Sequence, residues 1–117
     1  MSDAPIRLCN IADVPADGTN GFLLETEKGR VGTIVVRQAE ELFVYVNSCP
    51  HIGAPLDFKP GRFLNVERTH IICTTHAALF RIDDGYCVSG PCAGASLIAL
   101  DAEVRDGEVF VMLPKAN

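Results

Sequence analysis

The clearest indication of the fold class is the run Val31-Gly-Thr-Ile-Val-Val-Arg37, followed by Glu41-Leu-Phe-Val-Tyr-Val-Asn47. Both runs are rich in β-branched and aromatic residues, which favour strands. The residues Gln38-Ala-Glu-Glu41 between them are suited to turning the chain back on itself. The stretch therefore predicts two antiparallel strands joined as a hairpin.

The same strand rhythm continues on both sides of this hairpin. Asp84-Gly85 and Asp106-Gly107 are strong hairpin signals with apolar residues around them, and Lys28-Gly29 is a weaker one. Val104 to Val111 predicts a closing hairpin in which valines lie opposite one another. No segment of ten or more residues shows helical periodicity. We therefore expect an all-β fold, an antiparallel β-sandwich or small barrel.

Length and charge narrow the class of protein. A chain of 117 residues has room for one domain, which we assign to residues 1–117. A net charge of -5 argues against binding nucleic acid or an anionic membrane surface. No signal peptide is visible, and apolar runs such as Ile34-Val-Val36 are far too short to cross a bilayer. We expect a soluble, cytoplasmic protein without a membrane anchor.

One segment interrupts the strands, and it opens with a candidate metal ligand pair. Residues 48–61 hold three prolines and two glycines, which suits a loop of fixed shape. The loop begins with Cys49-Pro-His51, and a second pair follows in Cys73-Thr-Thr-His76. Thiolate and imidazole together suit zinc or an iron–sulfur cluster.

Two features favour the cluster over zinc. In zinc fingers two cysteines form one pair and two histidines the other, whereas here each pair holds one of each. Gly53 and Pro55 shape a loop whose backbone N–H groups can point inward, toward the negative charge of bridging sulfides. A structural Cys2His2 zinc site in an interaction module remains the non-redox alternative.

Three stretches resemble the Rieske-type [2Fe–2S] proteins, and the resemblance covers most of the chain. They are Cys49-Pro-His-Ile-Gly-Ala-Pro-Leu56, Cys73-Thr-Thr-His-Ala-Ala-Leu-Phe80 and Gly85-Tyr-Cys-Val-Ser-Gly-Pro91. The first two are similar to the family's cluster-binding loops, and the third to the proline-containing loop that covers the cluster. The resemblance implies a Rieske-like β-sandwich or small barrel whose cluster-binding part spans about residues 48–92.

The resemblance also implies the cofactor and its ligands. One [2Fe–2S] cluster is expected, with Cys49 and Cys73 on one iron and His51 and His76 on the other. Two neutral imidazoles leave the cluster less negative than four thiolates do, so adding an electron costs less. Such centres lie at about -150 to +300 mV, against about -400 mV for plant-type ferredoxins.

Several positions depart from the family. Respiratory and photosynthetic Rieske proteins join the two loops by a disulfide, but Ala54 and Thr75 stand at those positions. Those proteins also hydrogen-bond the cluster from a serine and a tyrosine, where this chain has Ala78 and Phe80. Fewer donors predict a potential in the lower part of the range. Ala77 replaces a glycine found in many relatives, which strains the loop if φ is positive there.

The remaining cysteines and the third histidine have ordinary structural interpretations. Cys9 is expected to be an apolar strand residue, and His70 a surface or strand-edge side chain rather than a ligand. Cys87 and Cys92 flank Gly90-Pro91. They are either buried residues of the fold or the two halves of a reversible disulfide.

The function that these features predict is one-electron transfer, by a carrier that is not itself an enzyme. The expected partners are a flavin-dependent reductase and a terminal oxygenase or hydroxylase. The alternative is a Rieske-fold small subunit of a larger oxidoreductase, such as an assimilatory nitrite reductase. The length argues against the Rieske domain of a ring-hydroxylating oxygenase, since no mononuclear-iron domain fits beside it.

Overall fold

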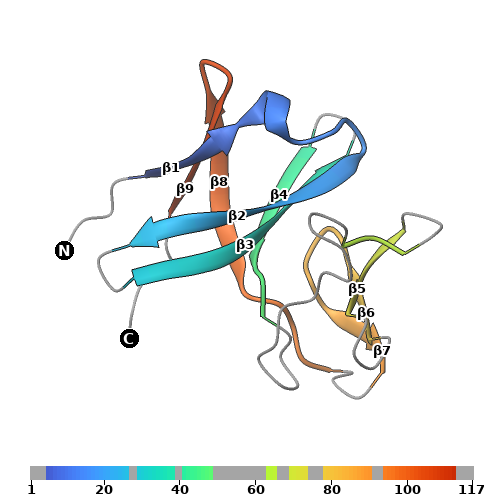
Figure 1. The fold of residues 1–117 in the computed structure, drawn as a ribbon. Helices are drawn as coiled ribbons and strands as arrows, with labels where there is room; N and C mark the ends of the chain where they lie inside the picture. The colour runs from blue at the N-terminus through green and yellow to red at the C-terminus, as the bar shows by residue number, and fades with distance from the viewer. Residues whose placement is uncertain are drawn as a thin grey trace.

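Figure 1 shows the computed structural model of the chain, which describes residues 5–26, 29–38, 41–48, 63–65, 69–73, 78–90 and 94–112. A short 3₁₀ turn, η1, covers Ile11–Asp13. The strands are β1 Ile6–Asn10, β2 Gly18–Thr26, β3 Gly29–Gln38, β4 Glu41–Val46, β5 His70–Cys73, β6 Ala78–Arg81, β7 Cys87–Ser89, β8 Ala99–Arg105 and β9 Glu108–Met112. In the described part of the chain, no helix is long and apolar enough to span a membrane.

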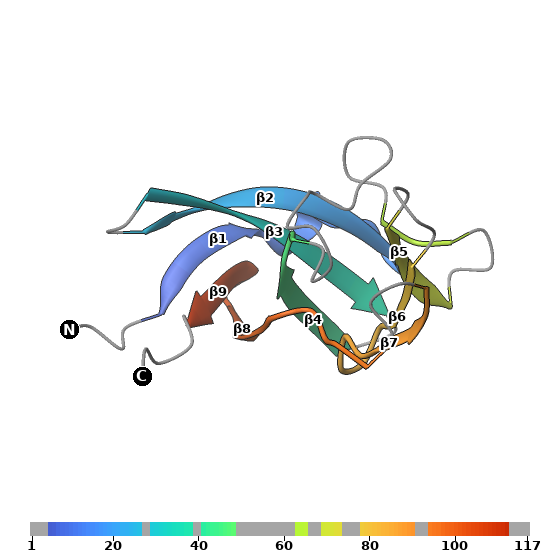
Figure 2. The same ribbon diagram turned by 90° about the horizontal axis from the view of Figure 1, so that it is seen from below.

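The strands form two antiparallel sheets. The larger one has the order β1-β9-β8-β4-β3-β2, and its edge strands β1 and β2 come close together, so that the sheet curls into a nearly closed barrel (Figure 2). The smaller one has the order β5-β6-β7 and lies to one side of the barrel (Figure 1). The prediction of an all-β antiparallel fold is confirmed.

The predicted hairpins are also present. Gln38 pairs with Glu41 where β3 meets β4, and Val104 pairs with Val109 where β8 meets β9. Asp106 and Gly107 both have positive φ, at 51° and 79°. Positive φ at both central residues is the mark of the type I′ turn, whose twist matches that of the strands it joins. The Asp-Gly signal therefore acts through backbone conformation.

The β3–β4 hairpin is buried on both of its faces, because it separates two groups of core residues. Ile34 on β3 and its partner Tyr45 on β4 point toward the small sheet. Their neighbours Val35 and Val44, also paired, point into the barrel. Side chains alternate along a strand, so a strand with a core on each side needs apolar residues at every position. This explains the unbroken run from Ile34 to Val36.

The small sheet is joined to the barrel by hydrogen bonds at its margins. The backbone N–H of Leu97, in the segment that leads into β8, donates to the carbonyl oxygen of Gly85 at 2.9 Å. The N–H of Val46 at the end of β4 donates to the carbonyl oxygen of Ile98 at 2.9 Å. Segment 94–98 therefore borders β7 and also contacts β4, which places the small sheet against the barrel.

Candidate metal centre

Cys73 is the predicted ligand that the described residues include, and it lies at the end of a short hairpin. It is the last residue of β5, pairs with Ala78 at the start of β6, and is only 1% exposed. Residues 74–77, which contain the predicted ligand His76, connect these two paired positions. The β5–β6 ladder therefore supports the second candidate ligand pair from both sides.

The first candidate loop returns to the fold beside Cys73. Its described flanks are Ser48, just after β4, and Phe63, which is fully buried. The backbone N–H of Ile72, the neighbour of Cys73, donates to the carbonyl oxygen of Phe63 at 2.8 Å. This bond brings the end of the first loop and the start of the second to the same place.

The proline-containing segment meets the same position through Gly90. Gly90 has a φ of +103°, and a Cβ placed on it would lie 2.7 Å from Cα of Ala78. Real Cβ atoms essentially never come so close, so only glycine allows this contact. At least one flank of each of the three segments predicted to surround the cofactor therefore lies at or next to the Cys73–Ala78 pair.

The surroundings of Cys73 suit the predicted iron–sulfur cofactor. Its side chain belongs to a group of buried residues that includes Ile71, Ala78 and Phe80. These side chains exclude water on that side and offer the sulfur no hydrogen-bond donor. A thiolate in such a place is stabilised by a metal rather than by solvent. The alanine and phenylalanine noted as departures from the family are thus part of a dry core.

The other predicted ligands, Cys49, His51 and His76, lie outside the described residues. So do Ala54, Thr75, Ala77, Pro91 and Cys92. Within the described ranges there is no group of three His, Cys, Asp or Glu side chains placed to hold a metal ion. The four-ligand set therefore stays a prediction. Its described member, Cys73, lies in buried surroundings that suit a metal ligand.

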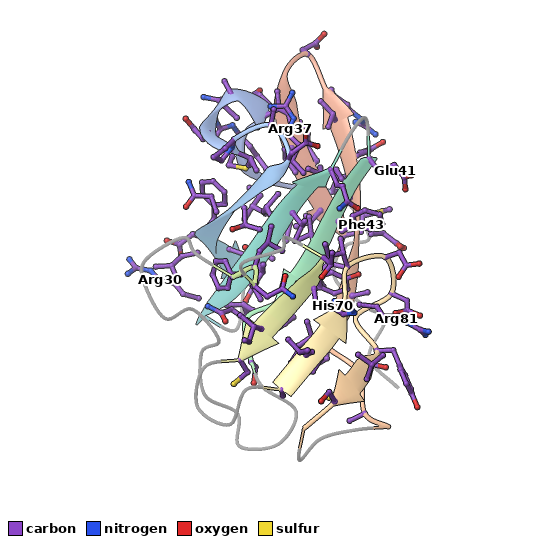
Figure 3. All side chains as sticks on the ribbon, turned by 90° about the vertical axis from the view of Figure 1, so that its right-hand side faces the viewer. Arg30, Arg37, Glu41, Phe43, His70 and Arg81 are labelled. Atoms are coloured by element: carbon purple, nitrogen blue, oxygen red, sulfur yellow. The ribbon has the colours of Figure 1, made fainter. Side chains whose placement is uncertain are left out.

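Three residues that were not predicted as ligands, Cys9, Cys87 and His70, occupy ordinary strand positions. Cys9 is a buried residue of β1, and Cys87 is a buried residue of β7 whose Sγ donates to the carbonyl oxygen of Ser89 at 3.2 Å. His70 begins β5, at the opposite end of the strand from Cys73, and its Nδ1 lies 2.9 Å from Oγ1 of Thr69. Figure 3 shows it near Arg81, its partner on β6.

The turn between β6 and β7 carries the clearest electrostatic interaction near the site. Arg81 binds Asp84 through two hydrogen bonds, Nε to Oδ1 at 3.0 Å and Nη2 to Oδ2 at 2.5 Å. These bonds, with the backbone N–H of Tyr86, hold the pKa of Asp84 below its ordinary value. The paired charges fix the turn that precedes the Gly90 segment.

Two further residues, Tyr45 and Phe63, help to position the site, although neither belongs to a recognisable sequence motif. The hydroxyl of Tyr45 donates to the carbonyl oxygen of Ile82, and Phe63 packs against Gly21 of β2. A tyrosine inside an otherwise apolar strand is a weak signal, because a buried hydroxyl needs a partner. For Phe63 the sequence offers no such signal, since its side chain packs against Gly21, a residue distant in the chain.

Comparison with known proteins relates the whole arrangement to one family. The model of the Rieske [2Fe–2S] domain matches residues 4–111. Among curated proteins, no match is found.

Solved structures with the same fold include two small ferredoxins. The ferredoxin of carbazole 1,9a-dioxygenase from Nocardioides aromaticivorans has a TM-score of 0.75 at 24% identity, covering 96% of this chain and 99% of its own. The Sphingomonas yanoikuyae B1 ferredoxin has a TM-score of 0.71 at 28% identity, covering 95% of this chain and 100% of its own. The terminal oxygenase from Nocardioides aromaticivorans has a TM-score of 0.77 at 19% identity, but this chain covers only 32% of it.

Proposed function

Because the chain belongs to the Rieske [2Fe–2S] domain family, we propose that it carries single electrons from a reductase to a terminal oxygenase or hydroxylase. The observation that carries this proposal is the structural similarity of this chain to small ferredoxins, over nearly the full length of both chains. One of these ferredoxins comes from a dioxygenase system. The carrier acts as one domain, residues 1–117, and turns over no substrate alone. We place it in the cytoplasm, where clustered cysteines more often bind metals or do redox work than form disulfides.

The family's cluster has two cysteine and two histidine ligands, and we assign these to Cys49, His51, Cys73 and His76. When bound, the cluster takes up and releases one electron at a potential within about -150 to +300 mV. The burial of Cys73 and the position of its flanks beside Phe63 and Gly90 support the assignment.

The residues around the site do two kinds of work. Ile71, Ala78 and Phe80 keep water from one side of the Cys73 sulfur, which strengthens every charge interaction there. The β5–β6 ladder and the Ile72 N–H bond to Phe63 hold the backbone of both ligand loops at their described ends. A rigid backbone limits the reorganisation that accompanies a change in charge, which favours fast electron transfer.

Absorption and electron paramagnetic resonance spectra of the purified protein, before and after reduction, test the proposed function. We expect a coloured oxidised protein, a paramagnetic reduced cluster, and iron and acid-labile sulfide in equal amounts. A colourless protein that contains zinc and no sulfide would contradict the proposal and favour the zinc module.

The ligand assignment has a matched pair of variants, because Cys73 and Cys9 are both buried strand cysteines. Cys73→Ala is expected to abolish the cluster spectrum, whereas Cys9→Ala is expected to retain it. Iron content per folded chain, with folding checked by circular dichroism, gives the measurement. A Cys73→Ala variant that keeps a Rieske spectrum would remove Cys73 from the ligand set.

A further inference from the structure

The small sheet presents apolar side chains to solvent along the strand that borders segment 94–98. Tyr86 forms a β-bridge with Ser96, so residues next to this bridge alternate in step on both segments. Gly85, Cys87 and Leu97 point inward and are buried. Tyr86, Val88 and Ile98 therefore share the outward side, where they are 39%, 43% and 54% exposed. We call these three residues the outer face.

Both edges of the small sheet are already occupied, so a partner cannot bind by adding a strand there. On the β5 side the N–H of Ile72 bonds Phe63, and on the β7 side the N–H of Leu97 bonds Gly85. Binding at this sheet must therefore use side chains, and the outer face supplies the apolar ones. Figure 3 views the molecule from the side on which this sheet lies.

The charges next to the outer face leave it acidic. The Arg81 guanidinium lies over the Tyr86 ring, 4.9 Å from its centroid, but Asp84 neutralises its charge. Asp83 is exposed in the same turn and, within the described ranges, has no ion pair. Each arginine in the described part of the chain is engaged, by Glu108, Glu25, Asp84, Glu103 or backbone carbonyls. Among the residues that the structure describes, the uncompensated charge beside the face is thus negative.

We propose that the outer face docks an electron-transfer partner that presents an apolar patch ringed by lysine or arginine. The inference rests on the proposed function, since it names the surface by which the carrier meets its partner. Transient redox complexes bury less surface than stable ones, below about 1,200 Å² in total, so a patch of a few apolar side chains is of suitable size.

A second copy of this chain fits the face less well than such a partner does. Two copies each carry a net charge of -5 and would bring Asp83 toward an equally acidic surface. A stable dimer also requires a standard interface of roughly 1,600 Å² or more. Charge and size therefore both favour a basic partner that binds briefly.

Reduction of cytochrome c by the reduced, cluster-loaded protein tests the proposal, because lysines ring the exposed haem edge of cytochrome c. Val88→Ser and Ile98→Ser are expected to lower the second-order rate constant about three- to tenfold each. Val104→Ser is the matched control, since Val104 is an equally exposed valine, 47%, at the far β8–β9 hairpin. It is expected to leave the rate unchanged.

A second pair of variants tests whether the negative charge of Asp83 contributes to docking. Asp83→Asn is expected to lower the rate at low ionic strength and to weaken its dependence on salt, because one attractive charge is removed. Asp106→Asn removes an exposed carboxylate in the β8–β9 turn and is expected to change neither. The midpoint potential, measured for every variant, is expected to stay constant.

Equal rates for Val88→Ser, Ile98→Ser and Val104→Ser would overturn the docking proposal while leaving the electron-carrier function intact. A dimer in sedimentation that Val88→Ser dissociates would also overturn it, by assigning the face to a second copy. A protein that binds no cluster would instead refute the proposed function. In that case, calorimetric titration of oxidised cytochrome c into the same variants decides the docking proposal without electron transfer.

Discussion

The hydroxyl of Tyr45 on β4 donates a hydrogen bond of 2.5 Å to the carbonyl oxygen of Ile82 in the turn after β6. Both residues are buried; Tyr45 lies in the large sheet, and Ile82 directly follows β6 of the small sheet. Burial raises the pKa of the tyrosine, and the nearby Asp84 and Asp83 carboxylates raise it further, so the hydroxyl keeps its proton and remains a donor. This bond ties the predicted cluster-binding sheet to the barrel at a defined distance.

Replacing Tyr45 by phenylalanine is expected to destabilise the protein by about 1–3 kcal/mol, because the buried carbonyl of Ile82 loses its donor. The free energy of unfolding from urea titration measures the effect. Tyr86→Phe is the control, since Tyr86 is an exposed tyrosine next to β7 of the small sheet. It is expected to change the free energy of unfolding by less than about 0.5 kcal/mol. Equal effects of the two substitutions would show that the Tyr45 bond contributes nothing.

Gly90 and Gly94 provide a second comparison, because both have positive φ but different surroundings. A Cβ on Gly90 would collide with the backbone of Ala78, whereas a Cβ on Gly94, at a φ of +97°, would meet nothing within 4 Å. Gly94→Ala is expected to cost about 1–2 kcal/mol from backbone conformation alone. Gly90→Ala is expected to cost about 1–3 kcal/mol more, from overpacking. Similar free energies of unfolding for the two variants would contradict the close Gly90–Ala78 contact.

The raised pKa of the buried Cys9 thiol is expected to make the protein less stable at alkaline pH. Burial, with a smaller contribution from Asp13, raises the pKa of its thiol from 9.0 to about 11 in the folded protein. The unfolded chain therefore loses the Cys9 proton near pH 9, while the folded chain keeps it until about pH 11. The stabilisation is complete below pH 9 and is lost between pH 9 and 11, by about 2–3 kcal/mol.

The measurement is the free energy of unfolding of wild type and Cys9→Ala across this interval. The wild type is expected to show the steeper fall, because every other group that titrates there is shared by both proteins. Parallel curves would show that the Cys9 thiol ionises equally easily in the folded and unfolded chains.

The last prediction concerns the reduction potential. Ala78 is buried and pairs with Cys73, and no hydroxyl at position 78 can donate toward the cofactor. The wild-type midpoint is therefore expected in the lower part of the range of about -150 to +300 mV, and a value above about +200 mV would refute this reasoning. Ala78→Ser is expected to raise the midpoint, because a hydroxyl donor stabilises the reduced, more negative cluster. An unchanged midpoint in a folded, fully loaded variant would count against it.

Much of the fold follows from local sequence. The Asp106-Gly107 turn forms because aspartate and glycine tolerate positive φ, and the β3–β4 hairpin forms because its β-branched and aromatic residues favour extended backbone. The candidate ligands could also be recognised from local sequence, because cysteine and histidine at short spacing are uncommon outside metal sites. Cys9 and His70 were also placed correctly from their strand context. Cys87 is a buried residue of β7, while its predicted alternative, a disulfide with Cys92, involves a residue outside the described ranges.

The amino-acid sequence alone was therefore enough to predict the strand class, the main turns and the chemistry of the site. The packed fold was needed to show that Ile34 and Val35 face different cores, that Gly90 lies against Ala78, and that Phe63 bonds the neighbour of Cys73. The difference lies in how far along the chain each interaction reaches. Turn conformation and strand preference depend on adjacent residues, whereas these contacts join segments whose relative positions are set by the packing of the whole chain.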